Sequence, residues 1–312
     1  ATKARRDRGM EGVKGSGTSR DNHDDKLLSV GRSLSQKCGC SIKDAMAKKT
    51  LHIAEMESAS VSTLMARNTD TLPVMIVNGQ ELVGGKQNRI INSTVLVPPG
   101  TTALPVSCVE QARWSVPQAG FASHDALYPT LRAETVMQVA ASLRQSGTHT
   151  SDQSAIWANI AERQTAEAIL SPTGAMADLY DRRGGDLAAF ERAIPYPDGA
   201  VGMVTAIGGR VTGLELFDAP KTMAALWRTF VRAAALDALR APAAPAVAKE
   251  RAIRMARRVR EAKMETFSSP GIGHDIRFTG GGIAGAALVC QGVIIHMTLF
   301  RQHAVGNLSV TF

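Results

Sequence analysis

The sequence is poor in aromatic residues and in cysteine. Only 4% of the 312 residues are Phe, Trp or Tyr, so a core must be built mainly from Ala, Val, Leu, Ile and Met. Four cysteines are too few for a disulfide scaffold in a chain of this length. Cys38 and Cys40 have no second Cys/His pair at zinc-finger spacing. The pattern therefore favours a reduced, cytoplasmic protein without a metal centre.

Long apolar runs are also missing from the sequence. No run reaches the roughly 18 residues that a membrane span requires, and the charged N-terminal end predicts no signal peptide. We therefore expect no membrane partner. Hydrophobic residues still make up 44% of the chain, which is enough for a buried core and argues against general disorder.

The net charge of +8 is unevenly distributed along the chain. Residues 1–50 contain twelve Lys/Arg against six Asp/Glu, residues 240–263 contain eight against two, and the rest is mildly acidic. A DNA-binding domain more often carries its positive charge on the folded body, so we rank nucleic-acid association through these basic segments last. Residues 1–40 show no helical or strand period and are predicted to form a flexible basic tail.

From residue 41 to residue 300 the pattern predicts one α+β domain, in which antiparallel β-hairpins alternate with helical blocks. Apolar runs bounded by turn residues predict strands in three regions, 51–113, 199–217 and 276–300. Apolar residues at helical spacing predict helices over 41–49, 127–147, 151–170, 221–240 and 249–267.

Turn and linker residues complete this prediction. Asn78-Gly79 lies between Val-rich flanks and predicts a β-hairpin with a type I′ turn, which needs two residues that tolerate positive φ. Residues 241–248, rich in Ala and Pro, are predicted to be a linker inside the domain. Residues 301–312 are predicted to be a C-terminal extension.

One polar segment interrupts two apolar runs. Lys86–Arg89 (KQNR) follows the pair Gly84-Gly85, whose backbone N–H groups could approach an anion while the flanking cations supply charge. A solvated loop is the alternative interpretation. The spacing is not that of a Walker motif.

A second block, PVSCVEQARW, places chemical groups at the end of a predicted strand. Strand alternation puts Cys108 and Glu110 on one face, with Arg113-Trp114 beyond them. Such a wall would offer a general base, a cation and a stacking surface. The alternative is a buried cysteine, which is commonly inert, beside a surface Glu–Arg pair.

The blocks GQELVGGKQNRIINSTVLVP, LPVSCVEQARW and SDQSAIW, in this order, resemble the ARPP family. The name stands for ARG and rhodanese-phosphatase superfamily-associated protein domain, with ARG for ADP-ribosyl glycohydrolase. The resemblance covers residues 42–300. It implies a prokaryotic family of unestablished activity whose genomic neighbours process ADP-ribose and NAD-derived compounds. The family's polar signature falls on Glu81, Lys86, Gln87, Asn88, Arg89, Asn92, Cys108, Glu110, Arg113, Trp114, Asp152 and Gln153.

Two hypotheses about function follow. In the first, the protein binds or processes a nucleotide-like ligand related to NAD or ADP-ribose, without a further cofactor, and Glu110 or Glu81 is the general base if catalysis occurs. The ligand-binding residues are then Lys86, Gln87, Asn88, Arg89, Asn92, Arg113, Trp114, Asp152 and Gln153. In the second, the protein is a non-catalytic interaction or structural module, and the KQNR and CVExxRW residues form a buried polar network. The sequence leaves open whether the protein is an enzyme.

Overall fold

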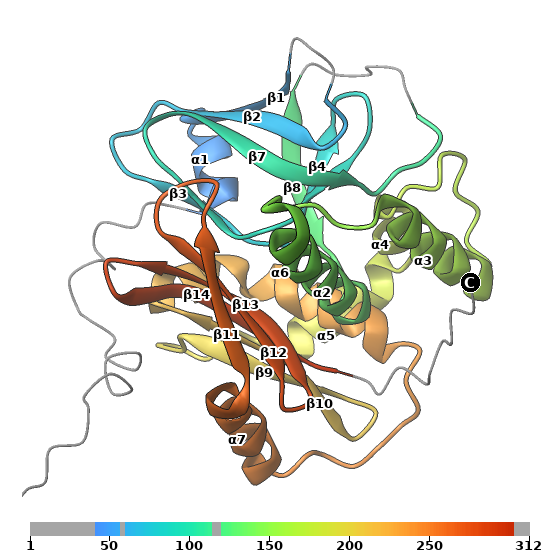
Figure 1. Ribbon diagram of the computed structural model, residues 1–312. Helices are drawn as coiled ribbons and strands as arrows, with labels where there is room; N and C mark the ends of the chain where they lie inside the picture. The colour runs from blue at the N-terminus through green and yellow to red at the C-terminus, as the bar shows by residue number, and fades with distance from the viewer. Residues whose placement is uncertain (1–40, 57–59, 114–119, 303–312) are drawn as a thin grey trace, which may run out of the picture.

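Residues 41–56, 60–113 and 120–302 are described by a computed structural model of the protein (Figure 1). Within these ranges the chain forms two six-stranded antiparallel sheets with helices packed beside and between them, which confirms the predicted α+β class. The predicted tail and most of the predicted C-terminal extension lie outside the described residues. None of the helices in these ranges combines the length and the apolar character that crossing a bilayer requires.

The first sheet comes from the N-terminal part of the chain and lies at the top of Figure 1. Its strand order is β1-β2-β7-β5-β4-β8. The strands are β1 (Leu51–Glu55), β2 (Thr63–Asn68), β7 (Gly100–Cys108), β5 (Arg89–Ile91), β4 (Gln80–Gly84) and β8 (Phe121–Ala126). Helix α1 (Ile42–Ala47) precedes them, and its N-cap Ser41 accepts a hydrogen bond from the Asp44 N–H, so the predicted helix is confirmed.

The hairpin predicted at Asn78-Gly79 is wrong. The preceding strand β3 (Val74–Ile76) pairs with β6 (Val95–Val97) in a separate two-stranded sheet, whereas β4 pairs with β5 and β8. Only Gly79 adopts a positive φ, of 78°, while a type I′ turn needs two such residues. The carbonyl and side-chain oxygens of Asn78 accept hydrogen bonds from Arg132. These tertiary contacts hold the chain where it passes from the two-stranded sheet into the first six-stranded sheet.

The middle of the chain forms a helical layer. Helix α2 (Pro129–Ser146) ends at Gly147, which has a φ of 69°, and α3 (Gln153–Ala166) begins after its N-cap Asp152. These two helices were predicted from the sequence. The layer also contains α4 (Ala177–Arg182), α5 (Gly184–Ala193) and α6 (Pro220–Ala238). Helix α2 packs against α6 and the second sheet, and α6 also contacts the first sheet through β8.

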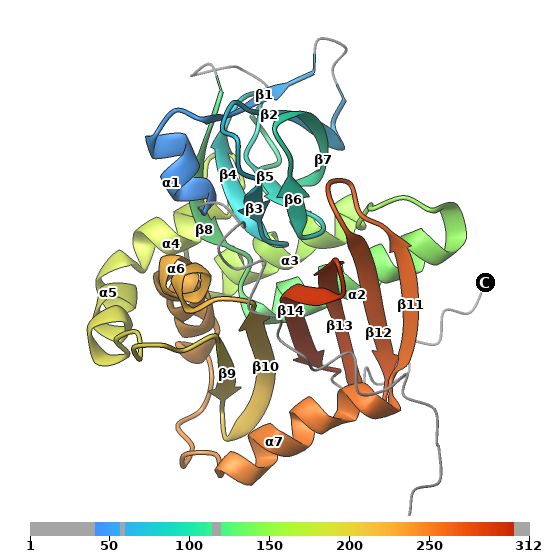
Figure 2. The same ribbon diagram turned by 90° about the vertical axis from the view of Figure 1, so that its left-hand side faces the viewer.

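The second sheet has the strand order β11-β12-β13-β14-β10-β9. Its strands are β9 (Gly202–Ile207), β10 (Arg210–Phe217), β11 (Lys263–Ser268), β12 (His274–Gly280), β13 (Ile283–Cys290) and β14 (Val293–Arg301). Between β10 and β11 the chain passes through α6, the linker over 241–248, α7 (Lys249–Arg257) and a 3₁₀ helix (Arg258–Glu261). Figure 2 shows α7 below the second sheet.

The basic helix predicted over residues 249–267 is therefore too long. Its last five residues belong to β11, an edge strand in which half-buried and exposed residues alternate. The two sheets meet through apolar side chains of β3 and β6, which share one buried cluster with Phe217 and Leu288 of the second sheet. This joint fixes the position of one half of the chain relative to the other.

Candidate functional site

The KQNR segment covers the end of the turn between β4 and β5 and the first residue of β5. Gly84 has a φ of 135°, and a Cβ there would lie 2.4 Å from the carbonyl oxygen of Gly120, so only glycine fits this turn. The side chains of Gln87, Asn88 and Arg89 are buried, and that of Lys86 is half-buried. The segment is therefore mostly internal, not a solvated loop.

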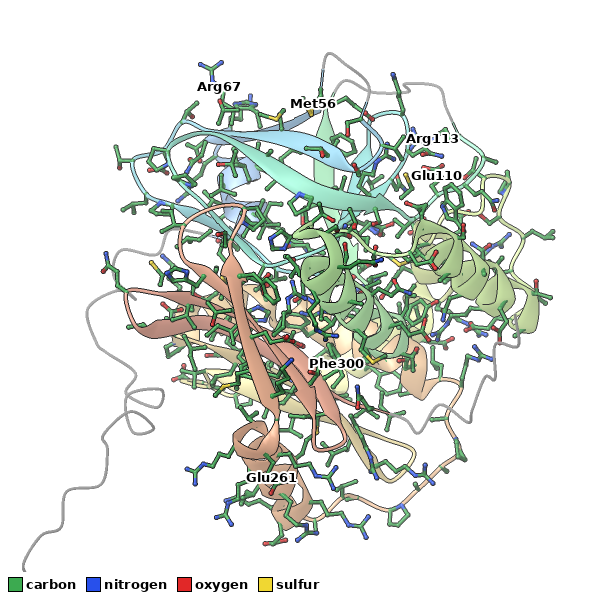
Figure 3. All side chains as sticks on the ribbon, viewed as in Figure 1. Met56, Arg67, Glu110, Arg113, Glu261 and Phe300 are labelled. Atoms are coloured by element: carbon green, nitrogen blue, oxygen red, sulfur yellow. The ribbon has the colours of Figure 1, made fainter. Side chains whose placement is uncertain are left out.

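Glu110 and Arg113 form an ion pair next to this turn, at the end of β7 (Figure 3). Arg113 Nε lies 2.8 Å from Glu110 Oε1, and its Nη2 lies 2.6 Å from Oε2. The Asn88 N–H also donates to Glu110 Oε2 at 3.0 Å. Arg113 further donates to the carbonyl oxygens of Gly84 and Gly85. One guanidinium thus joins the carboxylate to both glycines of the turn.

The electrostatics of Glu110 favour a fixed carboxylate. Burial alone raises its pKa, but the hydrogen bonds from Arg113 and Asn88 and the Arg113 charge bring the pKa below its ordinary value. Both oxygens already accept hydrogen bonds. A general base needs a pKa near the operating pH and a free lone pair, so this carboxylate is better suited to holding the turn than to taking a proton.

Arg89 is enclosed by the same turn and is only 1% exposed. Its Nη1 donates to the Gln87 carbonyl oxygen at 2.9 Å, and its Nη2 lies 3.8 Å from Oε1 of Glu55. Its Nε has no hydrogen-bond partner among the described residues. Gln87 in turn donates to the carbonyl oxygen of Gln111 at 3.1 Å. The carboxylate of Glu55 therefore supplies the negative charge that balances the Arg89 cation.

Two predicted site residues on α3 act on the backbone. Gln153 accepts a hydrogen bond from the Cys108 N–H at 2.7 Å and donates to the Cys108 carbonyl oxygen at 2.7 Å, as a neighbouring strand would. Asp152 caps α3 by accepting from the Ala155 N–H. Burial raises the pKa of the Cys108 thiol, which opposes thiolate formation.

Asn92 belongs to a polar joint between the two sheets. Its side chain donates to the carbonyl oxygen of His149 at 2.9 Å, while Ser93 Oγ lies 2.8 Å from His149 Nδ1. The next residue, Thr94, has its Oγ1 2.8 Å from Nδ1 of His296 in β14. Burial lowers the pKa of both histidines, which favours their neutral forms. His296 is thus a buried, hydrogen-bonded residue of the sheet.

Five of the predicted site residues therefore gather around the KQNR turn, and the others lie apart from them. Gln87, Asn88, Arg89, Glu110 and Arg113 pair with one another and with the backbone, as the second hypothesis describes. Lys86 lies at the edge of this network. Trp114, the predicted stacking surface, lies outside the described residues. These side chains line neither of the two larger cavities of the described structure, which have volumes of about 570 and 240 Å³.

Glu81 does not reach this network and instead faces β8. Its Oε2 lies 2.8 Å from Nδ1 of His124, while its Oε1 is buried without a hydrogen-bond partner in the described parts of the chain. Burial raises the pKa of Glu81. Burial lowers the pKa of His124, but the hydrogen bond and the charge of Glu81 outweigh this and raise it overall. His124 is about one-third exposed and was not singled out from the sequence.

Replacing Glu81 by glutamine is expected to lower the pKa of His124. The variant removes the charge that raises this pKa and leaves the burial that lowers it. An NMR titration of the His124 ring protons measures the change directly. Glu162→Gln, a change at an exposed carboxylate of α3, serves as the control and should leave the titration unchanged. An unchanged or raised His124 pKa in Glu81→Gln would contradict the assignment.

A cavity of about 570 Å³ lies where α2, α3 and the end of α6 meet the β9–β10 hairpin. This volume is within the range of roughly 300–1,000 Å³ that small-molecule sites usually occupy. We call it the central cavity. It is lined by Tyr128, Thr130, Asn159, Glu162, Arg163, Ile207, Gly208, Arg210, Thr212, Asp237, Arg240, Ala241 and Pro242.

One wall of the central cavity is held rigidly. Arg163 Nη1 lies 2.6 Å from Asp237 Oδ1, and the Arg163 guanidinium stacks 4.2 Å from the centre of the Tyr128 ring. The Tyr128 hydroxyl donates to Asn159 Oδ1 at 2.5 Å. Thr130 also donates to Asp237 through its N–H. These contacts fix the polar groups of the wall before any ligand enters.

Two other residues that line the central cavity carry unpaired charge. Arg210 and Arg240 are exposed, and neither guanidinium has an ion pair or hydrogen bond with the residues that the structure describes. Arg210 and Arg240 were not predicted as site residues, because one begins a strand and the other follows a helix 30 residues later in the sequence. No local motif marks such a pair.

The fold and these sites define an α+β protein with two antiparallel sheets, an internal polar network and a ligand-sized cavity. The chain belongs to the ARPP-1 family, described as ARG and Rhodanese-Phosphatase-superfamily-associated Protein domain, whose family model matches residues 28–300. This match confirms the resemblance and begins within the predicted tail. No curated protein and no solved structure matches the chain. The described residues contain no group of three or more His, Cys, Asp or Glu that could hold a metal ion.

Proposed function

We propose that this protein binds a phosphate-bearing, nucleotide-type ligand in the central cavity. The observation that carries the proposal is the presence of two guanidinium groups, Arg210 and Arg240, that line this cavity and make no ion pair with the described residues. Guanidinium groups recognise phosphate through paired, charge-assisted hydrogen bonds. A phosphate-bearing ligand would supply the missing counter-charge.

The other groups of the cavity suit the rest of such a ligand. Glu162 is exposed on the wall, and Thr130 and Thr212 add hydroxyl groups nearby. Carboxylate and hydroxyl groups are the usual partners of ribose hydroxyls, and few convergent polar groups suffice to orient a ligand. The name of the family, which refers to ARG, supports a ligand related to ADP-ribose over other phosphate esters.

In this proposal the KQNR segment and the Glu110–Arg113 pair form a scaffold and do not contact the ligand. The support is geometric, because Arg113 and the Asn88 N–H already occupy both oxygens of Glu110. A buried polar network of this kind favours one arrangement of the chain. In this proposal these residues therefore have the structural role that the second hypothesis gave them, as a buried polar network.

The test is a thermal-shift and calorimetric titration of the protein with ADP-ribose, NAD and AMP. A ligand that binds the native state alone should raise the melting temperature, since it adds about 2.7 kcal/mol of stability at a hundredfold excess over Kd. Arg240→Met should weaken binding about tenfold or more, which is about 1.4 kcal/mol. Arg182→Met, at an exposed arginine of α4 outside the cavity, should not.

Three results would overturn the proposal. One is the absence of any shift with all three compounds. Another is an equal loss of binding in Arg240→Met and Arg182→Met, which would indicate attraction by net charge. The third is a ligand whose binding disappears in Arg113→Met while the variant stays folded, which would move the site to the KQNR network.

A further inference from the structure

A second cavity, of about 240 Å³, lies between α7 and the second sheet, and five of its eight lining residues are arginines. These are Arg210, Arg251, Arg254, Arg258 and Arg301. The other three, Val211, Met255 and Ile283, are buried apolar residues and form its floor. We call it the arginine cavity.

The fold brings these arginines together from three distant segments. Arg251, Arg254 and Arg258 follow one another at intervals of three and four residues, so they project from one face of α7 and the 3₁₀ helix that continues it. Met255 anchors α7 in a buried cluster with Val211 and Ile283. Figure 2 shows the helix below the second sheet.

The strands supply the remaining two cations. Arg210 is the first residue of β10 and Arg301 is the last residue of β14, the strand paired with β10. Gly282, in the turn after β12, leaves room for one guanidinium, because a Cβ there would lie 2.8 Å from Nη1 of Arg258. The arrangement is thus a concave site built by tertiary contacts.

None of the five guanidinium groups has an ion pair or hydrogen bond within the part of the chain that the structure describes. No carboxylate lines the cavity. These five arginines are exposed, whereas the buried Arg132, Arg163 and Arg277 each contact a carboxylate at 2.6 Å. Five like charges around one small cavity repel one another, and an anion would relieve that repulsion.

We propose that the arginine cavity is a binding site for a chain of linked phosphates. The planar guanidinium fork binds phosphate oxygens in pairs, and five such groups match the several negative charges of an oligophosphate. The volume is below the roughly 300 Å³ at which sites for whole small molecules begin, which suits a phosphate chain without a nucleoside.

Two observations favour this ligand over a nucleic acid strand. The cavity is concave and contains no aromatic residue among those that line it, whereas single-strand binding sites use an extended groove with stacking platforms. Arg210 also lines the central cavity. A phosphate chain held here can therefore be free oligophosphate or the phosphate end of a nucleoside polyphosphate, and the two sources are separated by the experiment.

The experiment is a calorimetric titration of the full chain with sodium tripolyphosphate at two salt concentrations. The double variant Arg254→Gln/Arg258→Gln should bind at least about tenfold more weakly than the unaltered protein. The matched control is Arg257→Gln/Arg260→Gln, which removes the same charge from exposed residues of the same segment that do not line the cavity. It should bind as the unaltered protein does.

ATP and adenosine form the second arm of the experiment. If ATP and tripolyphosphate bind equally, free oligophosphate is the source. If ATP binds about tenfold more tightly, and Arg240→Met removes only that gain, a nucleoside polyphosphate is the source. Arg240→Met should keep tripolyphosphate binding in both cases, so a failure of the proposed function leaves this site testable.

The inference is overturned by any of three results. No heat of binding below about 1 mM tripolyphosphate would mean that the site has no useful affinity. An equal loss in the two double variants would show attraction by net charge alone. Displacement of tripolyphosphate by a single-stranded oligonucleotide that binds more tightly than ATP would assign the surface to nucleic acid instead.

Discussion

Replacing Arg132 by methionine is expected to lower the free energy of unfolding by about 3–5 kcal/mol. This side chain of α2 is 3% exposed. Its Nη1 lies 2.6 Å from Glu215 Oε1, its Nε donates to the Asn78 carbonyl oxygen at 3.0 Å, and its Nη2 donates to Asn78 Oδ1 at 2.8 Å. Arg132 therefore connects a helix to both sheets, and methionine would leave Glu215 buried without its main counter-charge.

The pH dependence of this loss follows from Glu215. Burial raises the pKa of Glu215, but the Arg132 charge and the hydrogen bonds from His296 and Thr298 bring it below its ordinary value. In the unaltered protein this carboxylate therefore adds stability above the ordinary pKa of glutamate, and the stability is lost as the pH falls. The difference between Arg132→Met and the unaltered protein should accordingly shrink in acid.

Urea denaturation of purified variants measures both effects. The matched control is Arg144→Met, because Arg144 on the same helix is 40% exposed and pairs with Glu265 at 2.8 Å. An exposed pair contributes about 0–1 kcal/mol. The assignment of Arg132 as a buried connector would be wrong if the two variants lost equal stability.

A second large effect is expected at Arg113, where methionine should lower the free energy of unfolding by about 3 kcal/mol. Glu110 is 3% exposed and depends on this guanidinium for both of its oxygens. The carbonyl oxygens of Gly84 and Gly85 would lose a donor in the same change. Because the Arg113 side chain is 15% exposed, water can replace part of these contacts, and the expected loss lies at the lower end for a buried pair.

Two further variants sharpen the measurement at Arg113. Arg113→Lys should recover only part of the stability, because an ammonium group cannot reproduce the paired contacts of the guanidinium. Arg67→Met, at an exposed arginine of β2 without an ion pair in the described ranges (Figure 3), should cost less than about 1 kcal/mol. A stable Arg113→Met protein would contradict the scaffold role and return Arg113 to the ligand-binding hypothesis.

Local sequence signals predicted the elements whose boundaries depend on local contacts. Ser41 caps α1 with its own hydroxyl, and Gly147 ends α2 because glycine tolerates a positive φ. The turn at Asn78 could not be predicted in this way, since its partner Arg132 is 54 residues away. The residues of β11 were predicted to be helical because they continue a basic helical segment. Their pairing with β12 makes them a strand instead.

The same distinction applies to the candidate sites. The KQNR segment and Glu110 were expected to lie together, and adjacent strands β5 and β7 bring them together. Glu81 was expected at the same site, but β4 also pairs with β8, and its side chain meets His124 there. Arg210 and Arg301 meet only because β10 and β14 pair, a contact that no run of neighbouring residues reveals.

The pairing of β10 with β14 also has a consequence for biosynthesis. Glu215 and Thr298, which are hydrogen-bonded across this pair, are 83 residues apart in the chain. During translation the β9–β10 hairpin therefore leaves the ribosome long before the strand that covers β10 exists. An uncovered strand edge can pair with another chain, so the nascent protein is exposed to misassembly until β14 has been made.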